Sequence, residues 1–186
     1  MRLRPLFLLP FALAAACGAP LGLPRASFEN KVDTVSLYAL SGTPVSFPSA
    51  YSLLFNLPVR PDQTTSLDFA FDLDSAGRAK LFPTGALHLG RASGIQLTTT
   101  PFDSIVIAPT GRYQLDSAVV VDSNSVAILH SSPTQCTFGI TTVYYAKLHV
   151  LAIDTTSGPN GRRIDFEILT DINCGYRGLE TGLPKR

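Results

Sequence analysis

The three histidines of the chain are its most versatile chemical groups, and they are far apart in the sequence. His88, His130 and His149 form none of the H-x-H, H-x-x-x-H or H-E-x-x-H spacings that bring two imidazoles to one metal ion. A Ser-His-Asp triad assembles in space rather than along the chain, so the abundant serines and aspartates leave that possibility open. The sequence therefore assigns no catalytic residue and no metal ligand, and His88 and His149 are expected as exposed imidazoles on the polar sides of strands.

The acidic residues give a similar result. The segment Asp72–Gly77 matches the first, third and sixth positions of a calcium loop, but Ala76 occupies the fifth position and Pro83 the twelfth, where a bidentate glutamate is needed. This segment is therefore expected to be a hairpin turn. Asp165 and Glu167 share one strand face and, without an apolar pocket to separate their pKa values, are expected as solvated surface charges. No nucleotide-binding glycine motif and no G-x-S-x-G motif occurs, so no cofactor is expected.

The N-terminal residues have the order of an export signal. Arg2 and Arg4 precede an apolar segment, Pro5–Leu13, which is much shorter than the roughly 20 residues of a membrane-spanning helix. Ala14–Ala16 then lead to Cys17. This order resembles the signal peptide and lipobox of bacterial lipoproteins, although Ala14 stands where that family favours leucine.

The resemblance, which covers residues 1–17 only, implies that Cys17 is lipidated and becomes the first residue of the mature chain. The protein would then be anchored to a membrane of the bacterial cell envelope and face the periplasm or the exterior. Two alternatives remain open. An ordinary signal peptidase could cut after Ala14–Ala16 and release a secreted or periplasmic domain, and a cytoplasmic protein could have an apolar start.

The cysteine count supports lipidation of Cys17. The chain has three cysteines, and an odd thiol in an exported protein needs an explanation. If Cys17 carries lipid, Cys136 and Cys174 remain as a pair, which an oxidising compartment would convert to a disulfide. Two buried free thiols are the alternative, because no C-x-x-C or neighbouring histidine pair suggests a metal.

The charge of the chain gives no reason to expect a nucleic-acid partner. The formal net charge is +1, and removal of residues 1–16 takes away Arg2 and Arg4 and leaves −1. The acylated Cys17 makes the lipid bilayer the one partner that the sequence indicates; a protein or ligand partner stays unidentified.

Three regions follow from these observations: a signal peptide at residues 1–16, a lipidated cysteine and linker at 17–30, and one β-rich domain at 31–186. The glycines and prolines of Gly18–Arg25 favour an irregular linker, which with the next residues spans about 40 Å when extended. The Gly-rich end of the chain, after Cys174, is expected to be a loosely packed coil.

The domain shows strand periodicity almost throughout. In residues 67–73 the odd positions are large and apolar and the even ones are Asp, Ala and Asp, which predicts one buried and one solvated face. Residues 144–152 and 164–168 alternate in the same way around the turn cluster Ser157–Gly161 and predict a long central hairpin. A second hairpin is predicted from 118–121 and 126–129, and a strand from 86–89.

About ten short strands, separated by Pro, Gly, Asp, Asn and Ser, predict an all-β fold: an antiparallel β-sandwich, or alternatively a small closed barrel. Fold alone gives no activity. Two functions are considered: a non-catalytic binding or structural module of the envelope, and an envelope hydrolase whose site forms only in the fold. A cleft that joins one of the histidines to a serine and an aspartate would favour the hydrolase.

Overall fold

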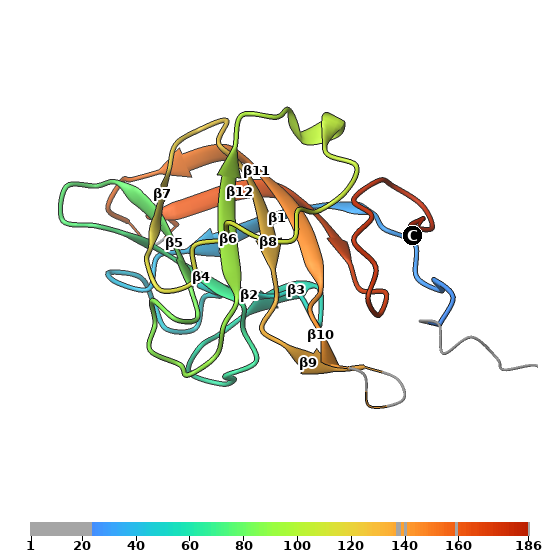
Figure 1. Ribbon diagram of the computed structural model, residues 1–186. Coiled ribbons are helices and arrows are strands. Elements are labelled where there is room, and N and C mark those ends of the chain that lie inside the picture. Colours follow the sequence, from blue (N-terminus) through green and yellow to red (C-terminus); the bar gives the residue numbers. More distant parts are fainter. Residues whose placement is uncertain (1–23, 137–138, 140, 159, 186) are drawn as a thin grey trace, which may run out of the picture.

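The computed structural model describes residues 24–136, 139, 141–158 and 160–185. Two five-stranded antiparallel sheets carry most of the domain (Figure 1). The first has the order β1-β12-β11-β8-β6 and the second the order β3-β2-β4-β5-β7, while β9 and β10 form a short separate ribbon.

The first sheet and the ribbon have these bounds: β1 Val32–Tyr38, β6 Gly94–Thr98, β8 Val126–His130, β9 Thr134–Gln135, β10 Thr141–Thr142, β11 Tyr145–Asp154 and β12 Arg163–Asp171. The second sheet comprises β2 Ala50–Ser52, β3 Leu57–Val59, β4 Phe69–Leu73, β5 Ala79–Pro83 and β7 Val119–Val121. A single 3₁₀ turn, η1 Phe102–Ser104, follows β6. Within the described residues no helix has the length and apolar character needed to cross a bilayer.

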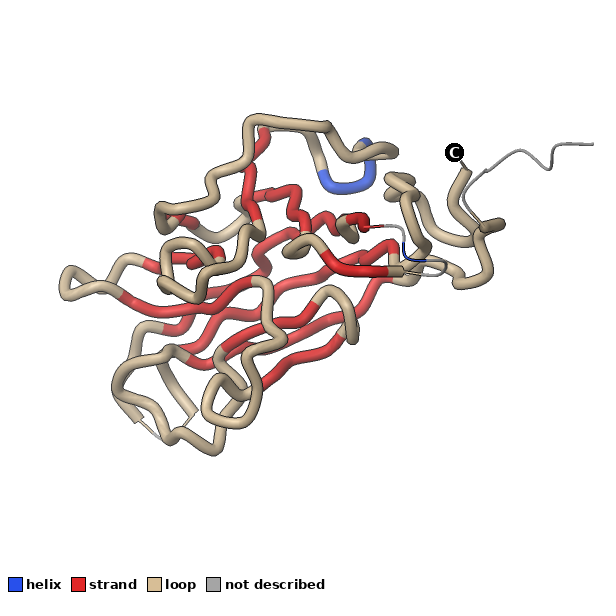
Figure 2. Tube along the Cα trace, turned by 60° about the horizontal axis from the view of Figure 1, so that its bottom comes forward, coloured by secondary structure: helices blue, strands red, loops and turns tan. Residues whose placement is uncertain are grey.

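The main core lies between the inner faces of the two sheets, which the tube view shows as two layers of strands (Figure 2). Its largest fully buried side chains include Phe69 and Phe71 from β4, Leu148 from β11 and Phe166 from β12. Neither sheet closes on itself among the described residues, so the sandwich, rather than the alternative barrel, is confirmed.

The predicted central hairpin is present. β11 and β12 pair from Tyr145↔Asp171 to Asp154↔Arg163 and occupy the middle of the first sheet. The expected turn after β4 is present as well, because the Gly77 N–H donates to the Asp74 carbonyl oxygen at 2.9 Å and β5 pairs with β4.

The predicted hairpin of 118–121 and 126–129 is wrong. β7 pairs with β5 in the second sheet, whereas β8 pairs with β11 and β6 in the first. The polar turn between them therefore carries the chain from one sheet to the other. Asn124, with a φ of 70°, donates its N–H to the Val150 carbonyl oxygen, which attaches this turn to β11.

Three other expectations need correction. Residues 86–89 form a turn, not a strand, and His88 sits there with a φ of 56°. The even positions of residues 67–73 are not uniformly solvated. Asp68 is buried, and Ala70 lies in a small outer cluster with Val59 and Leu67, whereas Asp72 stays partly exposed. The end of the chain is irregular but closely packed, since Leu179 is fully buried and lies in a cluster with Phe102 and Ile105.

Candidate functional site

A row of side chains crosses the outer face of the first sheet. Strand register places Thr98 opposite Val126, Val126 opposite His149, and His149 opposite Glu167. Because side chains alternate between faces, and the neighbours of His149 and Glu167 on their own strands face the core, all four point outward. Strands β6, β8, β11 and β12 thus present one continuous line of side chains to the same surface.

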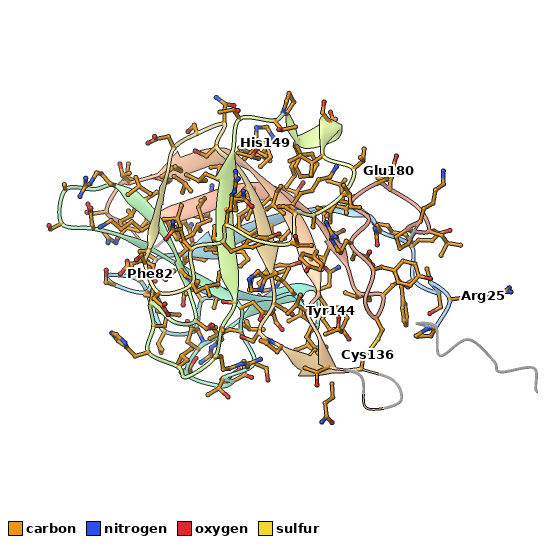
Figure 3. All side chains as sticks on the ribbon, viewed as in Figure 1. Arg25, Phe82, Cys136, Tyr144, His149 and Glu180 are labelled. Carbon is orange, nitrogen blue, oxygen red and sulfur yellow. A yellow bond between two sulfur atoms is a disulfide. The ribbon has the colours of Figure 1, made fainter. Side chains whose placement is uncertain are left out.

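This row forms the floor of an open groove of about 930 Å³. Residues 99–103, including the start of η1, form one wall and Asn124 and Ser125 form another. Figure 3 labels His149 at the upper edge of the molecule, beneath the loop that carries η1. The groove combines threonine hydroxyls and an amide with apolar surface from Val126 and Phe102, which is the mixture typical of ligand sites.

The two ionisable groups of the floor are hydrogen-bonded to each other. His149 Nδ1 lies 2.8 Å from Glu167 Oε1, and the two side chains are 25% and 29% exposed. A carboxylate on Nδ1 orients the imidazole and leaves Nε2 free of that contact. Asp165 and Glu167 share the outer face of β12 and are partly exposed, as predicted, but each has a partner: Glu167 bonds His149, while Asp165 bonds Ser36 and Arg163.

Lys147 supports the wall of the groove from beneath. It lies two residues before His149 on the same face and is only 4% exposed, under η1. Its ammonium donates to the carbonyl oxygens of Phe102 at 2.9 Å and Ile105 at 3.1 Å, and lies 4.6 Å from the centre of the Phe102 ring. Burial lowers the pKa of Lys147, and the charges of Asp103 and Glu167 oppose that shift.

The groove is acidic on balance. Asp103 and Glu167 line it, whereas neither lysine nor arginine is among its described lining residues and the Lys147 ammonium is already bound by backbone carbonyls. Among the described residues that line the groove, His149 is the only basic side chain. An anionic ligand would therefore meet like charge here.

The other two histidines do not join this site. His88 is exposed in the turn after β5. His130, at the end of β8, packs edge-on against Tyr113 with ring centres 4.5 Å apart, and burial lowers its pKa. Its Nδ1 lies 2.8 Å from the Ser131 carbonyl oxygen. A Cβ added at Gly94 would come within 2.4 Å of His130 Nε2, so this ring is tightly enclosed.

Sequence reasoning missed a buried polar cluster at Asp68. The Asp68 carboxylate accepts the N–H of Leu53 at 2.8 Å and the N–H of Ser132 at 2.9 Å, and it is 3% exposed. Ser93 Oγ donates to the Asp68 carbonyl oxygen and lies 3.0 Å from Thr84 Oγ1. Burial raises the pKa of Asp68, while the N–H groups of Ser132 and Leu53 lower it. These bonds connect the turn after β2 to the segment after β8, so the cluster joins the two sheets.

Neither of these clusters contains a triad. Among the described residues, no hydrogen bond joins a serine hydroxyl to His130 or to His149. The described part of the chain also holds no group of three or more His, Cys, Asp or Glu side chains placed for a metal. In the Asp72–Gly77 turn, the Asp74 carboxylate accepts the N–H groups of Ala76 and Arg78 and pairs with the side chains of Arg78 and Lys80.

Cys136 and Cys174, which are 38 positions apart in the sequence, form a disulfide with Cα atoms 5.9 Å apart. It joins the ribbon segment that precedes β11 to the coil that follows β12, at the open end of the central hairpin, where Tyr145 pairs with Asp171. Cys17, the predicted lipidation site, lies outside the described residues.

No model of a known protein family matches this chain, and a search of curated proteins also finds no match.

Proposed function

We propose that this protein is an exported lipoprotein, anchored to a membrane of the bacterial cell envelope through Cys17. Its β-sandwich domain binds an uncharged, hydroxyl-rich ligand, a saccharide, in the groove over His149 and Glu167 without chemically changing it. The observation that carries the binding role is the row of aligned side chains that four strands bring to the floor of one groove.

The anchor is supported by the order of residues 1–17 and by the pairing of the cysteines. The disulfide uses Cys136 and Cys174 and leaves Cys17 as the odd cysteine of the chain. A structural disulfide is typical of a protein that leaves the reducing cytoplasm. Both features fit a chain that is exported and carries its lipid on Cys17.

The class of ligand follows from the polar groups of the groove. Thr98 and Asn124 supply a hydroxyl and an amide, and the two carboxylates accept hydrogen bonds, while the apolar surface of Val126 can cover one face of a sugar ring. The acidic balance disfavours phosphates and carboxylates. An uncharged ligand with many hydroxyls satisfies the largest number of these groups.

The same groove supports a non-catalytic role better than a hydrolytic one. A nucleophile and its base must lie within hydrogen-bond reach, and no described hydroxyl is bonded to His149. The hydrolase stays a second candidate because of one observation, the carboxylate-oriented imidazole of His149, which is the arrangement that a general base for water requires.

Two measurements test the proposal. Intact mass of the membrane-extracted protein should show a chain that begins at Cys17 with diacylglyceryl and acyl additions; an unmodified chain that begins at Cys17 would instead indicate ordinary signal peptidase. Calorimetric titration of that protein with maltohexaose, cellohexaose and chitohexaose should show binding of at least one. Spermidine and polyphosphate serve as cationic and anionic comparisons.

The site is tested by Glu167→Ala and His149→Ala, which should weaken saccharide binding at least about tenfold, because each removes a group from the floor and frees its partner. Asp122→Ala, an exposed carboxylate outside the groove, is the matched control. Failure of all three hexasaccharides, or tighter binding of spermidine, would contradict the ligand class. Mass spectrometry of the saccharide after incubation would reveal cleavage if the hydrolase candidate were correct.

A further inference from the structure

Large apolar side chains are exposed together at one end of the domain. Phe28 is 55% exposed, Leu183 56%, Val106 48% and Ile107 53%. Backbone pairing explains why they are neighbours although they are remote in sequence: Asn30 bridges to Gly182, and Ile107 bridges to Gly178. The segments around residues 28, 106 and 183 therefore lie side by side, and we call their exposed apolar side chains the end patch.

The N-terminal segment is held at this same end. Asn173 Oδ1 accepts the N–H groups of Ser27 at 2.8 Å and Phe28 at 3.0 Å, and Asn173 Nδ2 donates to the Phe28 carbonyl oxygen. Asn30 Nδ2 donates to the Gly178 carbonyl oxygen at 2.8 Å. The part of the predicted linker from Ser27 to Asn30 is thus fixed to the domain, and the chain leaves the domain beside the end patch (Figure 1).

The part of the predicted linker that precedes these fixed residues is short. From Cys17 to Arg25 the chain can reach at most about 28 Å. A domain of this length has a diameter of about 40 Å, so the tether is shorter than the domain that it carries. A lipid on Cys17 would keep the end where the chain enters close to the bilayer.

From these three observations we propose that the end patch docks on the bilayer to which Cys17 is anchored, with Phe28 and Leu183 inserted at the lipid interface. This inference rests on the lipid anchor of the proposed function. Bilayer interfaces accept exposed apolar side chains of this kind beside a lipidated segment. In Figure 3 His149 lies at the upper edge while Arg25 lies at the right, so the docked domain keeps its groove clear of the lipid.

The charges at this end indicate what kind of membrane contact to expect. Residues 24–31 and 179–185 contain Arg25, Lys31 and Lys185 together with Glu29 and Glu180, which is three cations against two anions. A balance so close to neutral gives little attraction to anionic lipid. Docking should therefore depend on the apolar side chains and should occur on zwitterionic vesicles.

The absence of tryptophan from the chain makes the test direct. Phe28→Trp and Leu183→Trp each introduce a single reporter in the end patch, and Val45→Trp, at a residue 71% exposed beyond the far end of β1, is the matched control. The acylated proteins are reconstituted into phosphatidylcholine vesicles, with and without bromine on the acyl chains, and separated by flotation.

All three proteins should float with the vesicles, and brominated lipid should quench the reporters at 28 and 183 at least about twofold, with a blue-shifted emission, but not the reporter at 45. Flotation with equal quenching at all three positions, or with no quenching, overturns the docking and leaves the anchor intact. Proteins that lack acyl chains by mass and do not float overturn the anchor and the docking together.

Discussion

The substitution Lys147→Met tests whether a buried ammonium holds the wall of the groove. The methionine has a stem of similar length and keeps the apolar contact with Phe102, but it removes both hydrogen bonds to the loop. Since the described residues 99–105 contain only the short 3₁₀ turn η1 and belong to no strand, these bonds are central to their placement.

The size of the effect follows from two opposing contributions. Each hydrogen bond from a charged donor contributes about 1.5–3 kcal/mol, whereas burial of the ammonium costs several kcal/mol. The Phe102 carbonyl oxygen also accepts the Ile105 N–H at 3.2 Å and keeps that partner, so the Ile105 carbonyl oxygen suffers the greater loss. We expect Lys147→Met to lower the free energy of unfolding by about 2 kcal/mol at neutral pH.

The pH dependence gives an independent signature. Because the pKa of Lys147 is lowered from 10.5 in the folded protein, the folded chain binds fewer protons than the unfolded chain between the lowered value and 10.5. The contribution of Lys147 to the free energy of unfolding of the wild-type protein therefore increases as the pH rises through that window. Lys147→Met lacks this gain, so its stability deficit should widen with rising pH.

Urea denaturation from neutral to alkaline pH measures the deficit, and amide hydrogen exchange measures the loop. Exchange of residues 99–105 should accelerate in Lys147→Met, and saccharide binding should weaken, while Lys31→Met, at an exposed lysine, should change neither. A deficit below about 0.5 kcal/mol together with unchanged loop exchange would refute the supporting role of Lys147.

Three further variants test what stabilises the fold of the domain. Asp68→Ala leaves the buried N–H groups of its two backbone partners unsatisfied and should cost about 3 kcal/mol in urea denaturation. Because the pKa of Asp68 is raised above 3.8, that cost should be greatest below 3.8 and should shrink as the pH rises through the raised value. Replacement of Cys136 and Cys174 by alanine should lower stability by about 3–4 kcal/mol, and an unchanged urea midpoint would contradict a structural role for the disulfide. Gly94→Ala should cost about 1–3 kcal/mol by thermal denaturation, because its Cβ would overlap a neighbouring imidazole, whereas Gly111→Ala, with open space around it, should be close to neutral.

The fold class was predictable because long strands with one buried face show their period directly. Residues 144–150 and 164–168 alternate as predicted, and the structure pairs them in the middle of the first sheet. The predicted alternation fails at Ala152, which is exposed because a bulge shifts the register after Val150. The disulfide was predictable for a different reason, since the choice of partners for three cysteines is small once Cys17 is set aside.

The errors arise where one local pattern fits two arrangements. A polar turn such as 122–125 can join two strands of one sheet or carry the chain between sheets, and only the pairing partners of β7 and β8 distinguish these cases. Asp68 was assigned to a solvated face because alternation identifies which residues share a face, not what covers that face. The loops that bury it come from residues far along the chain.

The groove could not be predicted from the sequence. The side-chain alternation that reveals the fold nevertheless also determines which residues line the groove. Thr98, Val126, His149 and Glu167 meet only because four strands hold one register. A slip of one residue in β11 would turn His149 toward the core and Leu148 toward the groove. Since the core fixes which face of each strand is inward, the apolar residues between the sheets determine the site on the outer face. The site has therefore no local sequence signal, and residues that appear as scattered surface polar groups acquire a common role only in the folded sheet.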